Sequence, residues 1–323
     1  MSKPVKIWYV AGQRLCNFDC TYCVSVGDWA KSRRYDWRDP ADKDRFVSIV
    51  EWIGSRPFEV AVRLGSLGEP FASQTFLAQA GWLTRQRSVR YVELVSNGSL
   101  LMRRLPKMEP LANLGKLSLW LTYHDGQTNL DKFIAAAAFA QEEYGCFVVV
   151  NALLFPGGTD AIRRVRDAAR DAGLRFNVDL GYDPTAPSVA FESDGITAAV
   201  PMIRSEPDVV SAVEELGGDA ALTRAALVGL TSPQGRACRA GHDYVFIDIH
   251  GQVHRCSRYA VLERDCYGNV LDPDFELDLR PQEWVPCAAA RGCCNKEDFL
   301  NLDVAVTVGL RGGQVPSLGW TDA

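Results

Sequence analysis

Ten cysteines stand out in this chain of 323 residues, because nine of them fall into two groups. Three lie at positions 16, 20 and 23, six lie between 238 and 294, and Cys146 stands alone. The N-terminus lacks the apolar run of a secretory signal, so we expect a cytoplasmic protein with reduced thiols. In such a protein, grouped cysteines are more often metal ligands or reactive thiols than disulfides.

The first group, Cys16, Cys20 and Cys23, has the spacing C-x3-C-x2-C and directly follows a strand-like segment at 6–12. Reactive groups in parallel β/α folds collect at the carboxyl ends of the strands. A four-iron cluster normally takes four thiolates, so three thiolates leave one iron open to chelate a substrate or cofactor. A zinc site or a closed cluster would need a fourth ligand, and no His or Cys follows nearby in the sequence.

Strand-like and helix-like segments alternate from the N-terminus to about residue 183. Asp39 predicts a helix N-cap with Pro40 at the first helical position, and Gly145 predicts the end of another helix. Six βα units with short connections predict an α/β fold, a partial (β6/α6) barrel of the TIM type that stays open. The expected strands lie at 6–12, 59–66, 89–96, 116–124, 146–155 and 174–182.

The sequence pattern changes after about residue 183, where the alternation of strand-like and helix-like segments ends. We place the barrel at 1–183, a helical linker at 184–235, a small cysteine-rich β-hairpin domain at 236–304 and a tail at 305–323. The segment from 244 to 256 has alternating hydrophobic residues around His250-Gly251, which is typical of a hairpin.

A C-x3-C-x2-C triplet after the first strand of such a barrel resembles the radical S-adenosylmethionine (SAM) superfamily. The resemblance implies a [4Fe-4S] cluster on Cys16, Cys20 and Cys23 whose open iron binds the amino and carboxylate groups of SAM. It also implies reductive cleavage of SAM to a 5′-deoxyadenosyl radical, which takes a hydrogen atom from the substrate. A reductant such as flavodoxin or ferredoxin would supply the electron.

Further strand-end motifs resemble those of this family. The turn at 65–70, GSLGEP, resembles the Gly-Gly-Glu motif that grips the ammonium group of SAM, and 96–98 stands where members often carry Thr-Asn-Gly. The resemblance also implies that the fifth strand lines the adenine and ribose of SAM. Taken singly, these motifs are equally well explained by turn chemistry or packing. The resemblance assigns SAM binding to Gly65, Ser66, Gly68, Glu69, Ser96, Asn97, Asn151 and Leu153.

The second group resembles the twitch/SPASM appendages of the same superfamily. Cys238, twelve residues, Gly251, four residues and Cys256 match their opening pattern, which implies an auxiliary iron–sulfur cluster. The full SPASM pattern has seven cysteines in a different spacing, so the twitch type with one [4Fe-4S] cluster fits better. A zinc ribbon is the alternative. The expected ligands are four of the five cysteines Cys238, Cys256, Cys287, Cys293 and Cys294.

Cys266 remains unassigned by this count. In radical SAM epimerases a thiol returns a hydrogen atom to the substrate radical, which makes Cys266 a candidate hydrogen donor. A small buried hydrophobic residue or another cluster ligand is at least as good an interpretation.

Polar residues at the ends of the fourth and sixth strands suit a small polar substrate. His124 is equally well explained as a structural histidine. The candidate substrate residues are His124, Asp125, Asp179 and Tyr182.

The layout resembles aminoglycoside-tailoring members of the superfamily. We therefore expect removal of a carbinol hydrogen from a small sugar- or aminoglycoside-type substrate. Epimerisation is favoured over oxidation to a ketone because Cys266 is unassigned. A peptide-modifying SPASM maturase is less favoured, since only fifteen residues precede Cys16. The turn at 65–70 disfavours a non-enzymatic iron–sulfur or zinc protein.

Composition excludes two other kinds of partner. The net charge is −5 and there is no long basic run, which disfavours nucleic acid. No apolar run approaches the roughly 18 residues of a membrane span, so no membrane is expected.

Overall fold

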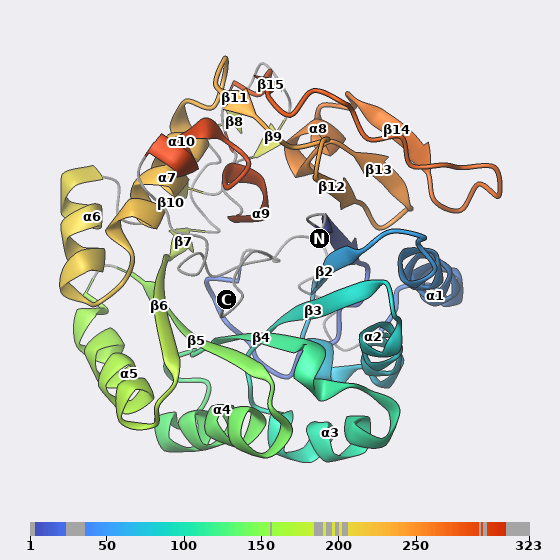
Figure 1. Ribbon diagram of the computed structural model, residues 1–323. Helices are drawn as coiled ribbons and strands as arrows, with labels where there is room; N and C mark the ends of the chain where they lie inside the picture. The colour runs from blue at the N-terminus through green and yellow to red at the C-terminus, as the bar shows by residue number, and fades with distance from the viewer. Residues whose placement is uncertain are drawn as a thin grey trace.

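The computed structural model describes residues 4–23, 36–155, 157–183, 190–191, 196–197, 200–201, 206–290, 292 and 296–307. Six parallel strands form its centre, in the spatial order of the sequence. They are β1 (Val5–Ala11), β2 (Val60–Ser66), β3 (Val89–Ser96), β4 (Leu117–Thr122), β5 (Phe147–Leu154) and β6 (Arg175–Leu180). Figure 1 shows them curving into an open barrel with the connecting helices on the outside. The helices are α1 (Pro40–Gly54), α2 (Gln74–Arg85), α3 (Leu101–Met108), α4 (Leu130–Tyr144) and α5 (Thr159–Asp171).

Local sequence signals fix the ends of these helices. The Asp39 side chain accepts from Ala41 N before α1, and the Ser73 side chain accepts from Phe76 N before α2. Gly145 ends α4 with a φ of 64°, a left-handed conformation that glycine adopts without steric cost. The predicted α/β fold with a mostly parallel sheet is confirmed. One helix, expected over about 100–114, is instead α3 followed by the short 3₁₀ turns η3 (Glu109–Leu111) and η4 (Leu114–Lys116).

The cysteine-rich segment extends the barrel sheet. Strand β12 (Tyr244–Ile247) runs parallel to β1, with Lys6 opposite Tyr244 and Tyr9 opposite Ile247. Strands β13 (Gln252–His254) and β14 (Cys266–Asn269) then continue antiparallel, so β14 is the last strand on that side. Gly251, with a φ of 85°, makes the predicted hairpin turn.

Two hydrophobic cores organise the molecule. The larger one lies between the barrel sheet and helices α1 to α5, and it includes residues of β12 and β13. The smaller one joins three cysteines to aromatic residues such as Tyr244 and Phe299. The elements around it are α7 (Ala220–Thr231), β11 (Ala237–Cys238), α8 (Ser257–Val261), β15 (Val285–Pro286), α9 (Lys296–Phe299) and α10 (Asp303–Thr307).

The remaining elements are short. Helix α6 (Glu206–Glu215) precedes α7, and the strands β7 (Tyr182–Asp183), β8 (Ala190–Phe191), β9 (Ile196–Thr197) and β10 (Val200–Pro201) form two small pairs. Within the described ranges, none of the helices has the length and apolar character needed to cross a membrane. Most of the expected tail, from 308 on, lies outside the described residues.

Candidate active site

A cavity of about 370 Å³ lies inside the barrel, where the carboxyl ends of the strands meet. All three cysteines of the first group line it, as do seven of the eight residues assigned to SAM. The exception is Gly65, which lies opposite Val10 in the sheet. The structure therefore brings together loops that are far apart in the sequence. The seven are Ser66, Gly68, Glu69, Ser96, Asn97, Asn151 and Leu153.

The turn after β2 is tied to the chain that leads to Cys16. Leu67 N and Gly68 N both donate to Gln13 O at 3.0 Å, and Glu69 N donates to Leu15 O at 2.8 Å. A Cβ at Gly68 would lie 2.4 Å from Leu15 O, a distance that real Cβ atoms do not reach. Gly68 is therefore required for this close approach of two backbones.

The cysteine loop is also held at its middle. Asn17 donates to Ser99 Oγ at 2.8 Å and accepts from the Asn97 side chain at 3.1 Å. Asp19 N donates to the Gln127 side chain at 3.2 Å. Because loops after β3 and β4 both contact it, the loop has a defined place over the barrel.

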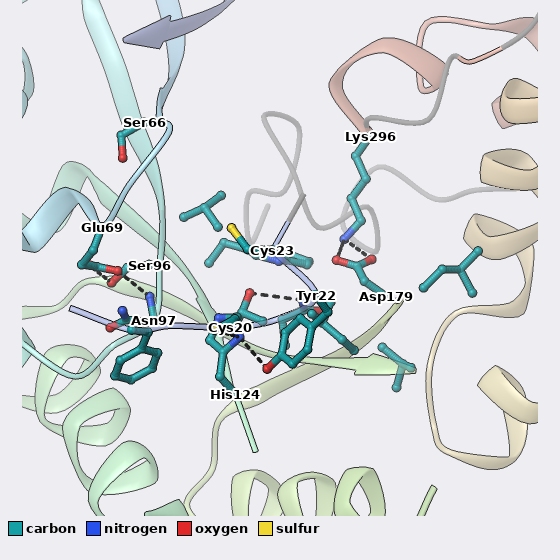
Figure 2. A pocket seen from close by; sticks show the side chains of 18 of the residues that line it. Cys20, Tyr22, Cys23, Ser66, Glu69, Ser96, Asn97, His124, Asp179 and Lys296 are labelled. Atoms are coloured by element: carbon teal, nitrogen blue, oxygen red, sulfur yellow. Dashed lines mark hydrogen bonds and ion pairs between the residues drawn. The ribbon is translucent and has the colours of Figure 1, made fainter. Parts of the chain in front are cut away.

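His124 contacts this loop. Its Nδ1 lies 3.1 Å from Tyr22 Oη and 3.6 Å from Cys20 Sγ, as Figure 2 shows. The Tyr22 and His124 rings are stacked with centroids 5.8 Å apart. Burial lowers the pKa of His124 to about 4, so its imidazole is neutral at pH 7. His124 was predicted to contact substrate; in the structure its contacts position the cysteine loop, and its ring also lines the cavity.

Glu69 is a buried carboxylate with three hydrogen-bond donors. It accepts from Ser96 Oγ at 2.7 Å, Asn97 N at 2.8 Å and Phe71 N at 3.0 Å. Burial raises its pKa, while these donors stabilise the charged form. A carboxylate has about four acceptor positions, so these three donors leave one of them, and Glu69 lines the cavity.

A second group of charged residues is linked by ion pairs, and we call it the charged cluster; it consists of Arg63, Glu93, Asp179, Lys296 and Glu297. Figure 2 shows two of its members, Asp179 and Lys296, on the other side of the cysteine loop from Glu69. Arg63 is ion-paired with Glu93 and, at 2.6 Å, with Glu297. Lys296 Nζ lies 2.6 Å from one Asp179 oxygen and 2.8 Å from the other. The same nitrogen lies 3.8 Å from the centroid of the Trp120 ring.

Sequence reasoning found only Asp179 of this cluster. Arg63 does carry a sequence signal, because it is the one charged residue of β2, and Glu93 of β3 lies opposite it in register. Lys296 and Glu297 carry none that we recognise, since a charged triplet after a cysteine pair is typical of an exposed turn. Their burial results from α9 packing over the cavity.

The other predicted substrate residues are Asp125 and Tyr182. Asp125 is exposed, follows Tyr123 and His124 in the loop after β4, and does not line the cavity. The side chain of Tyr182 lies outside the described part of the structure.

The second cysteine group is partly assembled. Cys238, Cys256 and Cys287 are all buried in the smaller core, with exposed fractions of 4%, 5% and 6%. Cys238 pairs with Val285 across β11 and β15, and Cys287 N donates to Arg236 O at 2.8 Å. Burial raises the pKa of each of the three thiols. Cys293 and Cys294, which were to supply the fourth ligand, lie outside the described residues.

Cys266 is not brought to the cavity. It lies on β14, the outermost strand of the sheet, with an exposed side chain 3.4 Å from the Gln252 side-chain oxygen. The position of Cys266 therefore does not support its predicted role as a hydrogen donor.

The three thiols of the cysteine loop are the ligand type of an iron–sulfur cluster, in which each thiolate binds a different iron. Cys16, Cys20 and Cys23 all line the same cavity, so they fit as ligands of one cluster. In the part of the chain that the structure describes, no three His, Cys, Asp or Glu side chains converge so that they could share one metal ion.

Solved structures with bound AdoMet share this fold. Native anSMEcpe with AdoMet and the Kp18Cys peptide has a TM-score of 0.54 at 15% identity, covering 84% of this chain and 78% of that one. Hexahistidine-tagged anSMEcpe with AdoMet has a TM-score of 0.53 at 15% identity, with 84% and 76% covered. Streptococcus suis SuiB bound to S-adenosylmethionine has a TM-score of 0.54 at 15% identity, with 84% and 64% covered.

By sequence, neither a protein-family model nor a curated protein matches the chain. At 15% identity the structural likeness establishes the fold alone. The chain therefore has the fold of the radical SAM enzymes that its sequence resembles.

Proposed function

We propose that the protein is a radical SAM enzyme that removes a carbinol hydrogen from a small polar substrate of the sugar or aminoglycoside type. The observation that carries this proposal is the common cavity. Three cysteines from one loop and seven strand-end residues expected to bind SAM border the same space of about 370 Å³. A cavity of this size has room for small ligands only.

Cys16, Cys20 and Cys23 would hold the [4Fe-4S] cluster. When bound, that cluster supplies the electron that cleaves SAM to methionine and a 5′-deoxyadenosyl radical. The chain's own residues would bind and orient SAM: Glu69 would accept from its ammonium group, and Asn151, which lines the same cavity, would face adenine and ribose. With SAM and substrate bound, the cavity would have to exclude water so that the radical meets the intended C–H bond.

The substrate radical can react in two ways, by epimerisation or by oxidation to a ketone. Epimerisation needs a hydrogen donor beside the substrate, and Cys266 is exposed and away from the cavity lining. Oxidation to a ketone needs a second electron acceptor, for which the buried cysteines 238, 256 and 287 would provide an auxiliary cluster. The position of Cys266 therefore favours oxidation to a ketone over epimerisation, although the count of unassigned cysteines favoured epimerisation. A peptide-modifying activity is the least favoured.

Anaerobic reconstitution tests the proposal. About eight irons per chain and the formation of 5′-deoxyadenosine on reduction are expected. Failure of a fully reconstituted protein to cleave SAM would refute the proposed chemistry. Product analysis in deuterated water separates the two fates: one solvent deuterium at an inverted carbon indicates a thiol donor, and loss of two hydrogens indicates oxidation.

A further inference from the structure

Arg255 is a buried cation beside the second cysteine group. It directly precedes Cys256 in the sequence, and its side chain is only 4% exposed. The guanidinium lies beside the Cys238 thiol, and its positive charge acts on the side chains of both Cys238 and Cys256. These two thiols and that of Cys287 are buried in the smaller core. The structure therefore holds a full positive charge within the same buried site as the three thiols.

The charge of Arg255 has little compensation from carboxylates. Among the described residues only Asp265 lies within ion-pair distance, at 3.8 Å, and its side chain is 51% exposed, so water screens it. The buried carboxylate of Asp298 instead accepts hydrogen bonds from Tyr244 and Ser257. The buried Nε of Arg255 has no hydrogen-bond partner in the part of the chain that the structure describes. Negative charge taken up by the thiols would therefore stabilise this cation.

Neutral acceptors hold the guanidinium in place. Arg255 donates to Tyr259 Oη at 3.1 Å and to two backbone carbonyl oxygens directly before Cys287 at 3.4 Å. Tyr259 Oη also accepts from Ala288 N at 2.9 Å, directly after Cys287. Because these acceptors are uncharged, they orient the guanidinium without cancelling its charge.

These features fit an iron–sulfur cluster on the buried thiols. The net charge of a cluster, the hydrogen bonds to its sulfurs and its exposure to solvent all set its reduction potential. Reduction adds one negative charge to the cluster, and a buried cation nearby stabilises that added charge. A positive charge at position 255 therefore favours the reduced state, which is the property of an electron acceptor.

We infer that Arg255 raises the reduction potential of the auxiliary cluster, so that this cluster accepts the electron of the substrate radical. The inference rests on the proposed function, since it requires the auxiliary cluster, and it deepens the oxidation alternative. In that alternative the substrate radical gives one electron to the cluster and its hydroxyl proton to water, and a ketone forms. Arg255 does not line the described cavity, so it acts through the cluster and has no contact with substrate there.

A potentiometric titration of the reconstituted holoenzyme, followed by electron paramagnetic resonance, tests the inference. Added SAM changes only the signal of the cluster on the first cysteine group, which identifies the two signals. In Arg255→Met the equilibrium constant for reduction of the auxiliary cluster should fall by about tenfold or more, equivalent to about 59 mV for one electron. The potential of the SAM cluster should stay the same. An unchanged auxiliary potential in a variant that retains about eight irons per chain overturns the inference.

Asp265→Asn provides the opposite change, because it removes the nearest negative charge and leaves Arg255 intact. Asp265 has a φ of 45°, a left-handed conformation that asparagine tolerates, so the variant should fold. The auxiliary potential should rise, by less than it falls in Arg255→Met because the carboxylate is exposed. If Arg255→Met loses its auxiliary iron, this variant decides: a rise supports the inference, and no rise overturns it.

Arg224→Met, at an exposed position on α7, is the matched control for the loss of one positive charge. It should leave both potentials unchanged, and a fall equal to that in Arg255→Met would contradict a local effect of Arg255. Iron content and SAM cleavage of the wild type test the proposed function separately. About eight irons and SAM cleavage without the shift refute the inference alone, whereas SAM cleavage with about four irons removes the auxiliary cluster and the inference with it.

Discussion

Gly68→Ala tests the contact on which the cysteine loop depends. The added methyl group would lie 2.4 Å from Leu15 O and 2.5 Å from Arg14 C, and both are backbone atoms that no side-chain rotation can move. The two backbones must separate, which strains or breaks the hydrogen bonds to Gln13 O and Leu15 O. Overpacking of this kind costs about 1–3 kcal/mol. If the cost falls on the arrangement of the loop, SAM affinity and cluster retention should decrease by about 5- to 150-fold.

Gly12→Ala is the matched control, because Gly12 follows β1 in the segment that leads to Cys16 and a Cβ there meets nothing within 4 Å. Both variants should be reconstituted anaerobically and compared for iron per chain, SAM binding and the free energy of unfolding in urea. Gly68→Ala should lose iron and SAM affinity, whereas Gly12→Ala should resemble the wild type. Equal retention of iron and SAM by the two variants would falsify the claim that this backbone approach positions the cysteines.

Burial and charge lead to four further expected outcomes. Burial raises the pKa of Glu93 from 4.5 to about 7, so the free energy of unfolding should fall as the pH rises through that interval, and urea titrations should show a smaller fall in Glu93→Gln. Lys296→Met and Asp179→Asn should be non-additive by about 0.5–3 kcal/mol in a double-mutant cycle, and additivity would contradict their ion pair. Cys256→Ala should reduce iron from about eight to about four per chain while SAM cleavage persists, and unchanged iron would remove this thiol from the auxiliary ligands. Cys266→Ser should leave product formation unchanged because the side chain is exposed and outside the cavity lining, and loss of product with intact SAM cleavage would restore the donor role.

The barrel and its cysteine loop could be predicted from the sequence because their signals are local. Asp39 and Ser73 cap helices through hydrogen bonds to residues two and three positions away. Parallel strands end at one edge of a sheet, so the triplet after β1 and the motifs after β2 and β3 had to meet once the alternation was recognised.

The charged cluster could not be predicted because its members are paired over long distances in the sequence. Arg63 contacts Glu297, and Lys296 contacts Asp179 across 117 positions. The pairing of β12 with β1 could not be predicted either, because these two strands are far apart in the sequence. The interpretation of Cys266 rested on a count of spare cysteines, and a count carries no information about position.

Helix α9 gives the cysteine-rich segment a role in the cavity that does not depend on whether it holds a metal. Asp298 accepts a hydrogen bond from Tyr244 Oη at 2.8 Å and others from Ser257, which is adjacent to Cys256. Its neighbours in the same turn, Lys296 and Glu297, are thereby directed at the barrel interior. Since a helix of four residues has little stability of its own, these contacts hold it in place. We therefore expect a rearrangement of the cysteines in the smaller core to displace Lys296 and Glu297 before it affects Glu69 and the cysteine loop, which are held by other elements.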